Sequence, residues 1–390
     1  MPGLHAVCPA SSSKRWLACT PSARLEEKLR NRFGDKSSPY AEEGTKAHAV
    51  AELKLKRLNG EINDFLFKEQ IKTLGEIPAE MDRYTDVYVD VVMEKLFTAR
   101  AQDPNAQLYI EQRLDFSPWV PGGFGTGDAI VVSDQTLEDC DLKYGKGVPV
   151  SAAENSQARL YGLGAINMFG ALYDFSVIRN TIIQPRLDSI SDETLTRDEL
   201  LAWGESIKPA AKLAWEGKGE FVTGDHCKFC AARAICAKRA SEALSIVRYG
   251  FDTPNVISDE DLPGILAVLD VAESWCKDIR EYAKSQALNG VRLPGWKLVR
   301  GRRGARSFTD EAMVREQLNR AGFGSDVVER HGLKSPAEIE KVIGKNAFEA
   351  LLSGYVSQAQ GSLELAPEDD KRPEYARADV DFGDMGEVST

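Results

Sequence analysis

The segment "LEDCDLKYGKG", residues 137–147, holds an acid and a base, Asp141 and Lys143, at a spacing that suits metal-dependent chemistry. Two residues apart on a predicted strand, both side chains should project from the same face. Asp128, in "GTGDAIVV", begins the preceding predicted strand, and a short turn would bring its carboxylate beside Asp141. Two carboxylates suit Mg²⁺ or Mn²⁺, and a neighbouring ammonium can orient a metal-bound water or neutralise charge on a phosphate. The alternative interpretation is a solvated ion pair, which is common on strands.

The elements that must position these residues alternate between helix and strand. Apolar alternation and β-branched residues predict three strands within residues 107–143 and a fourth over 175–185. Helices are predicted before, between and after these strands, over residues 19–34, 42–60, 84–101, 153–172 and near 194–216. This order predicts an α/β fold with a mixed central sheet flanked by helices.

Composition limits the class of protein. With 390 residues, 43% hydrophobic and 28% charged, the chain can form one large domain or two ordinary ones. It has no apolar run long enough for a membrane span, and its first residues lack a secretory pattern, so we expect a cytoplasmic protein. A net charge of −11 argues against coating nucleic acid through a general field, but it permits a local basic channel.

Cysteines offer a second kind of site. Seven cysteines, an odd number, in a compartment expected to be reducing argue against a disulfide framework. Cys227, Cys230 and Cys236 form a C-x2-C-x5-C cluster, which leaves a tetrahedral metal one ligand short. Cys19, far away in sequence, is the natural fourth ligand. The other candidate ligands are Cys8 and His226, whereas Cys140 and Cys276 are predicted to be buried thiols.

The ordered motifs resemble the PD-(D/E)XK nuclease superfamily, and within it the RecB/AddB-like branch with iron–sulfur nucleases. A Gly-x-x-x-His helix, an Asp, an Asp-x-Lys strand and a Gln-x-x-x-Tyr helix follow in that family's order, at Gly44–His48, Asp128, Asp141–Lys143 and Gln157–Tyr161. The resemblance implies a restriction-endonuclease-like core. It also implies that His48, Asp128 and Asp141 bind metal, that Asp128, Asp141 and Lys143 are catalytic, and that Gln157, Tyr161 and the upstream Glu111 position DNA.

Two positions depart from the family pattern. Asp139 and Cys140 stand where relatives usually have apolar residues, and Asp139 shares a strand face with Asp141. Asp139 is predicted to be either a third acid of the site or a solvated neighbour.

The same resemblance implies a [4Fe–4S] cluster held by Cys19, Cys227, Cys230 and Cys236, because such nucleases carry one cysteine near the N-terminus and three after the core. The cluster would act as a staple between distant parts of the chain. Zinc is the rival, since four thiolates also suit Zn²⁺.

After residue 245 the composition shifts. Residues 292–306 hold six bases and no acid, which makes Lys297, Arg300, Arg302 and Arg303 candidate DNA contacts. "PGWKLVRGRR" and "FTDEAMVREQLNRAGF" also resemble a phage-encoded family described as a domain of unknown function, over the chain up to about residue 372. We predict residues 1–245 as the nuclease core with its cluster, 246–366 as a mainly helical extension, and 367–390 as an acidic disordered tail.

Together these features predict a Mg²⁺- or Mn²⁺-dependent deoxyribonuclease of a phage-infected bacterial cytoplasm. We expect an exonuclease that acts from DNA ends in recombination or repair. A structure-specific or nicking endonuclease and a catalytically silent DNA-binding subunit are the alternatives. Besides DNA, a single-strand-binding or annealing protein is the expected partner. The region after residue 245 could also form a contact between copies of the chain in a homo-oligomer.

Overall fold

The computed structural model describes residues 6–34, 39–245, 260, 262–324 and 332–375. The chain divides into two compact units, Met1–Ser258 and Asp259–Thr390, each of which is described by itself below. The sequence prediction put the division after residue 245. Residues 246–258, which separate the two positions, lie outside the described residues.

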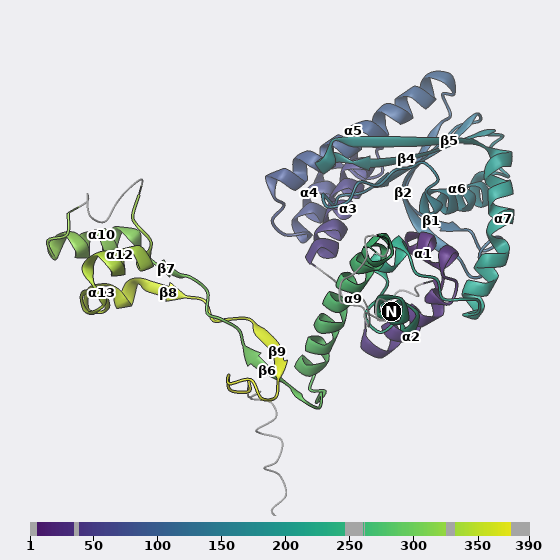
Figure 1. Ribbon diagram of the computed structural model, residues 1–390. Helices are drawn as coiled ribbons and strands as arrows, with labels where there is room; N and C mark the ends of the chain where they lie inside the picture. The colour runs from purple at the N-terminus through teal and green to yellow at the C-terminus, as the bar shows by residue number, and fades with distance from the viewer. Residues whose placement is uncertain (1–5, 35–38, 246–259, 261, 325–331, 376–390) are drawn as a thin grey trace, which may run out of the picture. The chain divides into compact units, whose positions relative to one another are not determined.

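A five-stranded mixed sheet forms the centre of the first unit (Figure 1). Its strands lie side by side in chain order: β1 (Gln107–Asp115), β2 (Phe124–Val132), β3 (Thr136–Leu142), β4 (Val177–Gln184) and β5 (Ser189–Thr196). Strands β3 and β4 are parallel and the other neighbours are antiparallel. A parallel pair needs a long crossover connection, and here it contains the helix that follows the Asp-x-Lys strand.

Helices cover both faces of this sheet. The unit contains α1 (Ser13–Ala18), α2 (Ser22–Phe33), α3 (Pro39–Leu58), α4 (Asp64–Thr73), α5 (Ala79–Gln102), α6 (Ser156–Phe169), α7 (Arg197–Glu216) and α8 (Ala237–Ala243). One face packs against α3 and α5, through a cluster that includes Leu55, Tyr88 and Leu142. The other face packs against α6, α7 and the N-terminal turns, through a cluster that includes Trp16 and Leu163. The predicted α/β fold with a helix-flanked mixed sheet is therefore confirmed.

Four elements of this unit were not predicted: β5, α1, α4 and α8. Strand β5, "SISDETLT", is a polar edge strand whose burial alternates along its length, so it lacks the apolar run of an internal strand. Helix α4 buries no residue, so it lacks the apolar face that predicts a helix. Its N-cap Asn63, which accepts a hydrogen bond from the Leu66 N–H, is the sequence feature that could have indicated its start.

The second unit combines helices with short strands. Its elements are α9 (Leu262–Leu288), β6 (Trp296–Arg300), β7 (Arg306–Phe308), α10 (Glu311–Arg320), α12 (Pro336–Ile343), α13 (Lys345–Leu352), β8 (Val356–Gln358) and β9 (Leu363–Pro367). Strand β6 pairs with β9 and β7 with β8. Val314, Leu318, Ile339, Phe348 and Leu352 form a small core among α10, α12 and α13. The predicted helical extension thus also contains two strand pairs, and a capping box formed by Ser335 and Glu338 starts α12.

The predicted disordered tail begins inside the ordered part of this unit. Residues 367–375 are described, and Glu374 forms an isolated bridge with Val299. Residues 376–390 lie outside the described residues. Among the helices that the structure describes, none is both long enough and apolar enough to cross a membrane.

Candidate functional site

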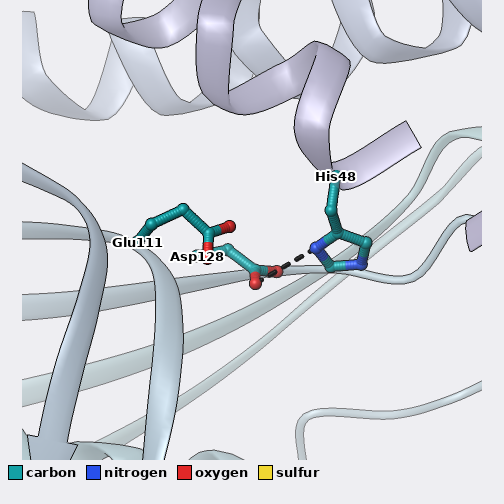
Figure 2. A group of neighbouring side chains, drawn as sticks. All are labelled: His48, Glu111 and Asp128. Atoms are coloured by element: carbon teal, nitrogen blue, oxygen red, sulfur yellow. Dashed lines mark hydrogen bonds and ion pairs between the residues drawn. The ribbon is translucent and has the colours of Figure 1, made fainter. Parts of the chain in front are cut away.

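His48, Glu111 and Asp128 converge where α3 lies over the middle of β1 and β2 (Figure 2). Helix α3 supplies His48, and the adjacent strands β1 and β2 supply the two carboxylates. One ligand atom from each residue lies within 4.8 Å of the other two, and His48 Nδ1 is 3.2 Å from Asp128 Oδ1. An imidazole with two carboxylates is a donor set that suits a divalent cation such as Mn²⁺ or Mg²⁺.

Glu111 reaches this group through an unusual backbone conformation. The β1–β2 register runs through Ile110–Ala129 and Gln112–Gly127, which places Glu111 opposite Asp128 without a ladder pair between them. Its φ of 49° lies in the left-handed region, which a non-glycine residue seldom adopts. Such outliers cluster at functional sites. Glu111 was predicted among the DNA-positioning residues, whereas the structure groups it with the candidate metal ligands.

Asp128 stands where β2 and β3 stop pairing. Their ladder ends at the Ala129–Cys140 pair. Just beyond it, Asp128 Oδ2 accepts a 2.8 Å hydrogen bond from the Leu142 backbone N–H. The carboxylate thus replaces a backbone acceptor at the point where the strands separate. Asp128 thereby links the His48 group to the end of β3, which carries Asp141.

A second group forms around Asp141. Lys143, directly after β3, places its Nζ 2.9 Å from Asp141 Oδ1 and 2.7 Å from Oδ2. Gln157, in the first turn of α6, donates from Nε2 to Asp141 Oδ1 at 3.1 Å and accepts from Lys143 Nζ at 3.3 Å. The solvated ion pair considered for Asp141 and Lys143 is not what the structure contains, because Asp141 is buried.

Helix α6 is fixed at its start and one turn later. Asn155 caps it by accepting hydrogen bonds from the backbone N–H groups of Gln157 and Ala158. Tyr161 follows one turn after Gln157, is buried, and hydrogen-bonds to the Gln157 side chain. Gly125 faces its ring, because a Cβ there would lie 2.6 Å from Tyr161 Cε1. In this structure Gln157 and Tyr161 therefore support Asp141 and Lys143 rather than projecting freely toward solvent.

The electrostatics of the site reflect this concentration of acids. Burial, followed by the Asp128 and Glu52 carboxylates, raises the pKa of Glu111 to about 7. Burial lowers the pKa of His48, but the hydrogen bond to Asp128 and the charges of Asp128 and Asp141 outweigh it, so the net shift is upward. Burial also lowers the pKa of Lys143, and Asp141 more than reverses this. A bound cation would relieve the repulsion among the carboxylates, so the donor set fits a divalent metal.

Asp139 is the acid left over from these interactions. It is 1% exposed, and among the described residues neither of its side-chain oxygens has a hydrogen-bond partner. Burial, followed by the charges of Asp141 and Asp128, raises its pKa well above the usual value. The prediction of a solvated neighbour is wrong; Asp139 is a buried acid behind Asp141.

Arg186 was missed by the sequence analysis. It lies in the turn Pro185–Leu187 after β4, and its side chain is only 7% exposed. Its Nη1 is 3.1 Å from Glu43 of α3, Nη2 is 3.6 Å from Glu80 of α5, and the guanidinium lies 4.8 Å from the centre of the Tyr144 ring. It thus connects the helix that carries His48 to the residue after Lys143. No motif marked it, since a lone arginine after a strand has no distinctive spacing.

The four clustered cysteines come from two distant segments that contact each other. Cys19 is the C-cap of α1. Cys227 lies in the turn Asp225–Phe229 and Cys230 directly follows it, and Cys236 is the N-cap of α8. Burial raises the pKa of the Cys227 thiol, and the nearby Cys236 and Cys19 thiols add to this rise.

Polar contacts hold the same two segments together. Arg15 Nη1 donates to the Phe229 carbonyl at 3.1 Å, and the Ala231 N–H donates to Glu26 Oε1 at 2.7 Å. Arg15 and Glu26 are themselves paired at 2.7 Å. These contacts therefore attach the N-terminal helices to the cysteine-bearing segment.

The remaining cysteines behave differently. Cys8 lies in the hydrophobic cluster of the first unit, and burial raises its pKa to about 12. Cys140 is buried as predicted, whereas Cys276 is exposed, so that prediction is wrong. The reason is that α9 buries only Ile265 among its described residues. His226 Nε2 lies 2.9 Å from the Val222 carbonyl oxygen, so the protein backbone already engages that nitrogen.

Comparison with known proteins identifies the family. The chain belongs to the family described as "Protein of unknown function (DUF2800)", whose model matches residues 5–373. The resemblance to a family of unknown function is thereby confirmed.

Two solved structures are also similar to this chain. One is a protein of Eubacterium rectale described as a "Putative exonuclease", at 15% identity over 65% of this chain and 91% of that one, with a TM-score of 0.32. The other is the crystal structure of SSO0001, at 16% identity over 56% of this chain and 94% of that one, with a TM-score of 0.23.

Proposed function

We propose that the protein is a divalent-metal-dependent deoxyribonuclease. One observation carries the proposal: Asp128 connects a His48–Glu111 group to an Asp141–Lys143–Gln157 group where β2 and β3 separate. A solvated surface ion pair does not need a buried carboxylate, a supporting amide and a neighbouring histidine. This set of donors with an adjacent ammonium is suited to hydrolysis of a phosphodiester.

Each side chain has a definite part in the proposed reaction. His48, Glu111, Asp128 and Asp141 would hold Mg²⁺ or Mn²⁺, which when bound supplies Lewis-acid stabilisation of the phosphate and an acidified water. Lys143, held charged by Asp141, orients the attacking water and balances negative charge on the phosphate. Gln157 fixes the Lys143 ammonium relative to Asp141, and Tyr161 fixes Gln157.

We further propose that the enzyme is an exonuclease acting from DNA ends, in the recombination or repair of phage DNA in a bacterial cytoplasm. This finer proposal rests on the resemblance to RecB/AddB-like nucleases. Its test is digestion of linear and covalently closed DNA of the same sequence with Mg²⁺ or Mn²⁺. Loss of the linear form alone supports the exonuclease, and cutting of the closed circle indicates the endonuclease. DNA binding without cleavage of either form identifies a silent binding subunit and refutes the enzyme.

The cysteines support a second proposal, a [4Fe–4S] cluster bound by Cys19, Cys227, Cys230 and Cys236. This proposal rests on the resemblance to iron–sulfur nucleases and on the contact between the two segments that carry the cysteines. In such a cluster each thiolate binds a separate iron. Zinc remains the rival, because four thiolates also suit Zn²⁺.

Metal analysis separates the two alternatives. Anaerobically purified protein should contain iron and sulfide and absorb in the visible range. A Cys276→Ser control, which changes an exposed thiol outside the set, should leave both unchanged. Zinc in place of iron would establish the rival site.

A further inference from the structure

The second unit contains a long two-stranded ribbon whose middle is irregular. Strands β6 and β9 form one end of the ribbon, and β7 and β8 form the other (Figure 1). Between them lies a segment that we call the waist, residues 301–305 on one strand and 359–362 on the other. Two hydrogen bonds keep the strands paired there, from Gly301 N to Ser362 O at 2.7 Å and from Gly304 N to Ala359 O at 2.9 Å.

The waist is thin because the two backbones touch. A Cβ at Gly361 would lie 2.0 Å from the Gly301 carbonyl oxygen, and a Cβ at Gly301 would lie 2.4 Å from Glu364 Oε1. Neither position can therefore carry a side chain. The sequence of the waist is "GRRGA" opposite "AQGS", so Arg302, Arg303 and Gln360 are its only long side chains.

The two arginines differ from the other bases of the ribbon. Lys297 donates to the Asp370 carbonyl at 2.7 Å, Arg300 lies over the Tyr375 ring at 5.0 Å, and Arg306 pairs with Glu340. Arg302 and Arg303 are exposed, and in the part of the chain that the structure describes neither makes a hydrogen bond or an ion pair. The waist itself contains no acid. Two guanidinium groups are thus displayed on a narrow backbone, and the Glu364 carboxylate that lies against Gly301 is already paired with Arg372 at 2.8 Å.

We propose that the waist binds duplex DNA, with Arg302 and Arg303 entering a groove and contacting phosphates or base edges. A two-stranded ribbon fits the major groove, and arginine is the residue that most often contacts guanine there. Single-stranded DNA is bound mainly by stacking of bases on aromatic side chains, and the waist has none. The site lies outside the proposed active site and rests on the proposed function only for the choice of DNA as ligand.

The test is a binding measurement in EDTA, so that cleavage does not contribute. We would titrate three full-length proteins onto a fluorescein-labelled blunt duplex and onto its top strand alone. They are wild type, the double variant Arg302→Gln/Arg303→Gln and the double variant Lys341→Gln/Lys345→Gln. The lysine variant is the matched control, because it removes the same charge from exposed positions of α12 and α13 in the same unit.

We expect the arginine variant to bind the duplex at least about tenfold more weakly, with the slope of log K against log salt reduced by about 1.8, or 0.9 for each lost phosphate contact. Its binding to the single strand should change less, and the lysine control should bind both as wild type does. Unchanged duplex binding, or an equal loss in the lysine control, would overturn the proposal. An equal loss on both DNA forms would assign the waist to general phosphate binding instead. The experiment measures binding and not cleavage. Its outcomes can therefore be interpreted even if the protein proves not to be a nuclease.

Discussion

Replacement of Asp139 by leucine should stabilise the metal-free protein. Leucine has the same branching and number of heavy atoms as aspartate, so it leaves no cavity, although its two methyl groups are bulkier than the carboxylate oxygens and offset part of the gain. Both Asp139 oxygens are buried without a partner among the described residues. An unsatisfied buried polar group costs about 1–3 kcal/mol, and the substitution should recover roughly that amount. In a domain of this size, each kcal/mol corresponds to about 2–4 °C in Tm.

The gain should depend on pH, and its sign follows from the raised pKa of Asp139. In the unfolded chain this carboxyl ionises above about pH 4, whereas the folded protein keeps it protonated to a higher pH. Over that interval the unfolded state is favoured, so wild-type stability is lost as pH rises. The difference between Asp139→Leu and wild type should therefore be larger at neutral pH than near pH 4.

Thermal or urea unfolding in EDTA at both pH values measures this difference. Asp139→Asn is the matched control, because it removes ionisation but keeps an unsatisfied polar group. It should recover the pH-dependent part alone. A leucine variant that is no more stable than wild type at either pH would refute the reasoning and show that Asp139 has a compensating partner.

Three further predictions concern the site and the cysteines. Gly125→Ala should slow cleavage roughly 10–100-fold, since the new Cβ would displace Tyr161; equal single-turnover rates would contradict this. Glu111→Gln should weaken Mn²⁺ binding at least about tenfold in calorimetry. The control Glu52→Gln should not weaken it, because Glu52 is paired with Lys56 and lies outside the group of ligands. Cys230→Ser should abolish visible absorbance and lower stability by roughly 3–5 kcal/mol in urea unfolding, and an unchanged spectrum would remove Cys230 from the ligand set.

Some of the site could be predicted because its residues lie on regular elements. Asp141 and Lys143 share a face through the period of a strand, and Gln157 and Tyr161 share one through the period of a helix. The left-handed φ of Glu111 could not be read from its sequence, because no glycine or turn motif marks the position. The alternation of β1 therefore gave no indication that Glu111 joins His48 and Asp128.

Burial of charged residues was harder to predict than their position. In sequence Asp139 could be a third acid of the site or a solvated neighbour, and the packing of α6 against the sheet makes it a buried acid. The exposed Cys276 shows the converse error, since an apolar-looking helix in a small unit has little core to enter. Strand β5 was missed because an edge strand needs few apolar residues.

Single-turnover cleavage of linear duplex DNA by wild type, Lys143→Ala and Lys146→Ala tests the central claim most directly. Lys146 is the matched control, because it is an exposed lysine of the same loop that makes no ion pair with the residues described. We expect Mg²⁺-dependent cleavage by wild type and Lys146→Ala, and a rate lower by roughly 10²–10⁴-fold for Lys143→Ala. Equal cleavage by all three proteins, or none by folded wild type, would contradict the assignment of this site to a nuclease.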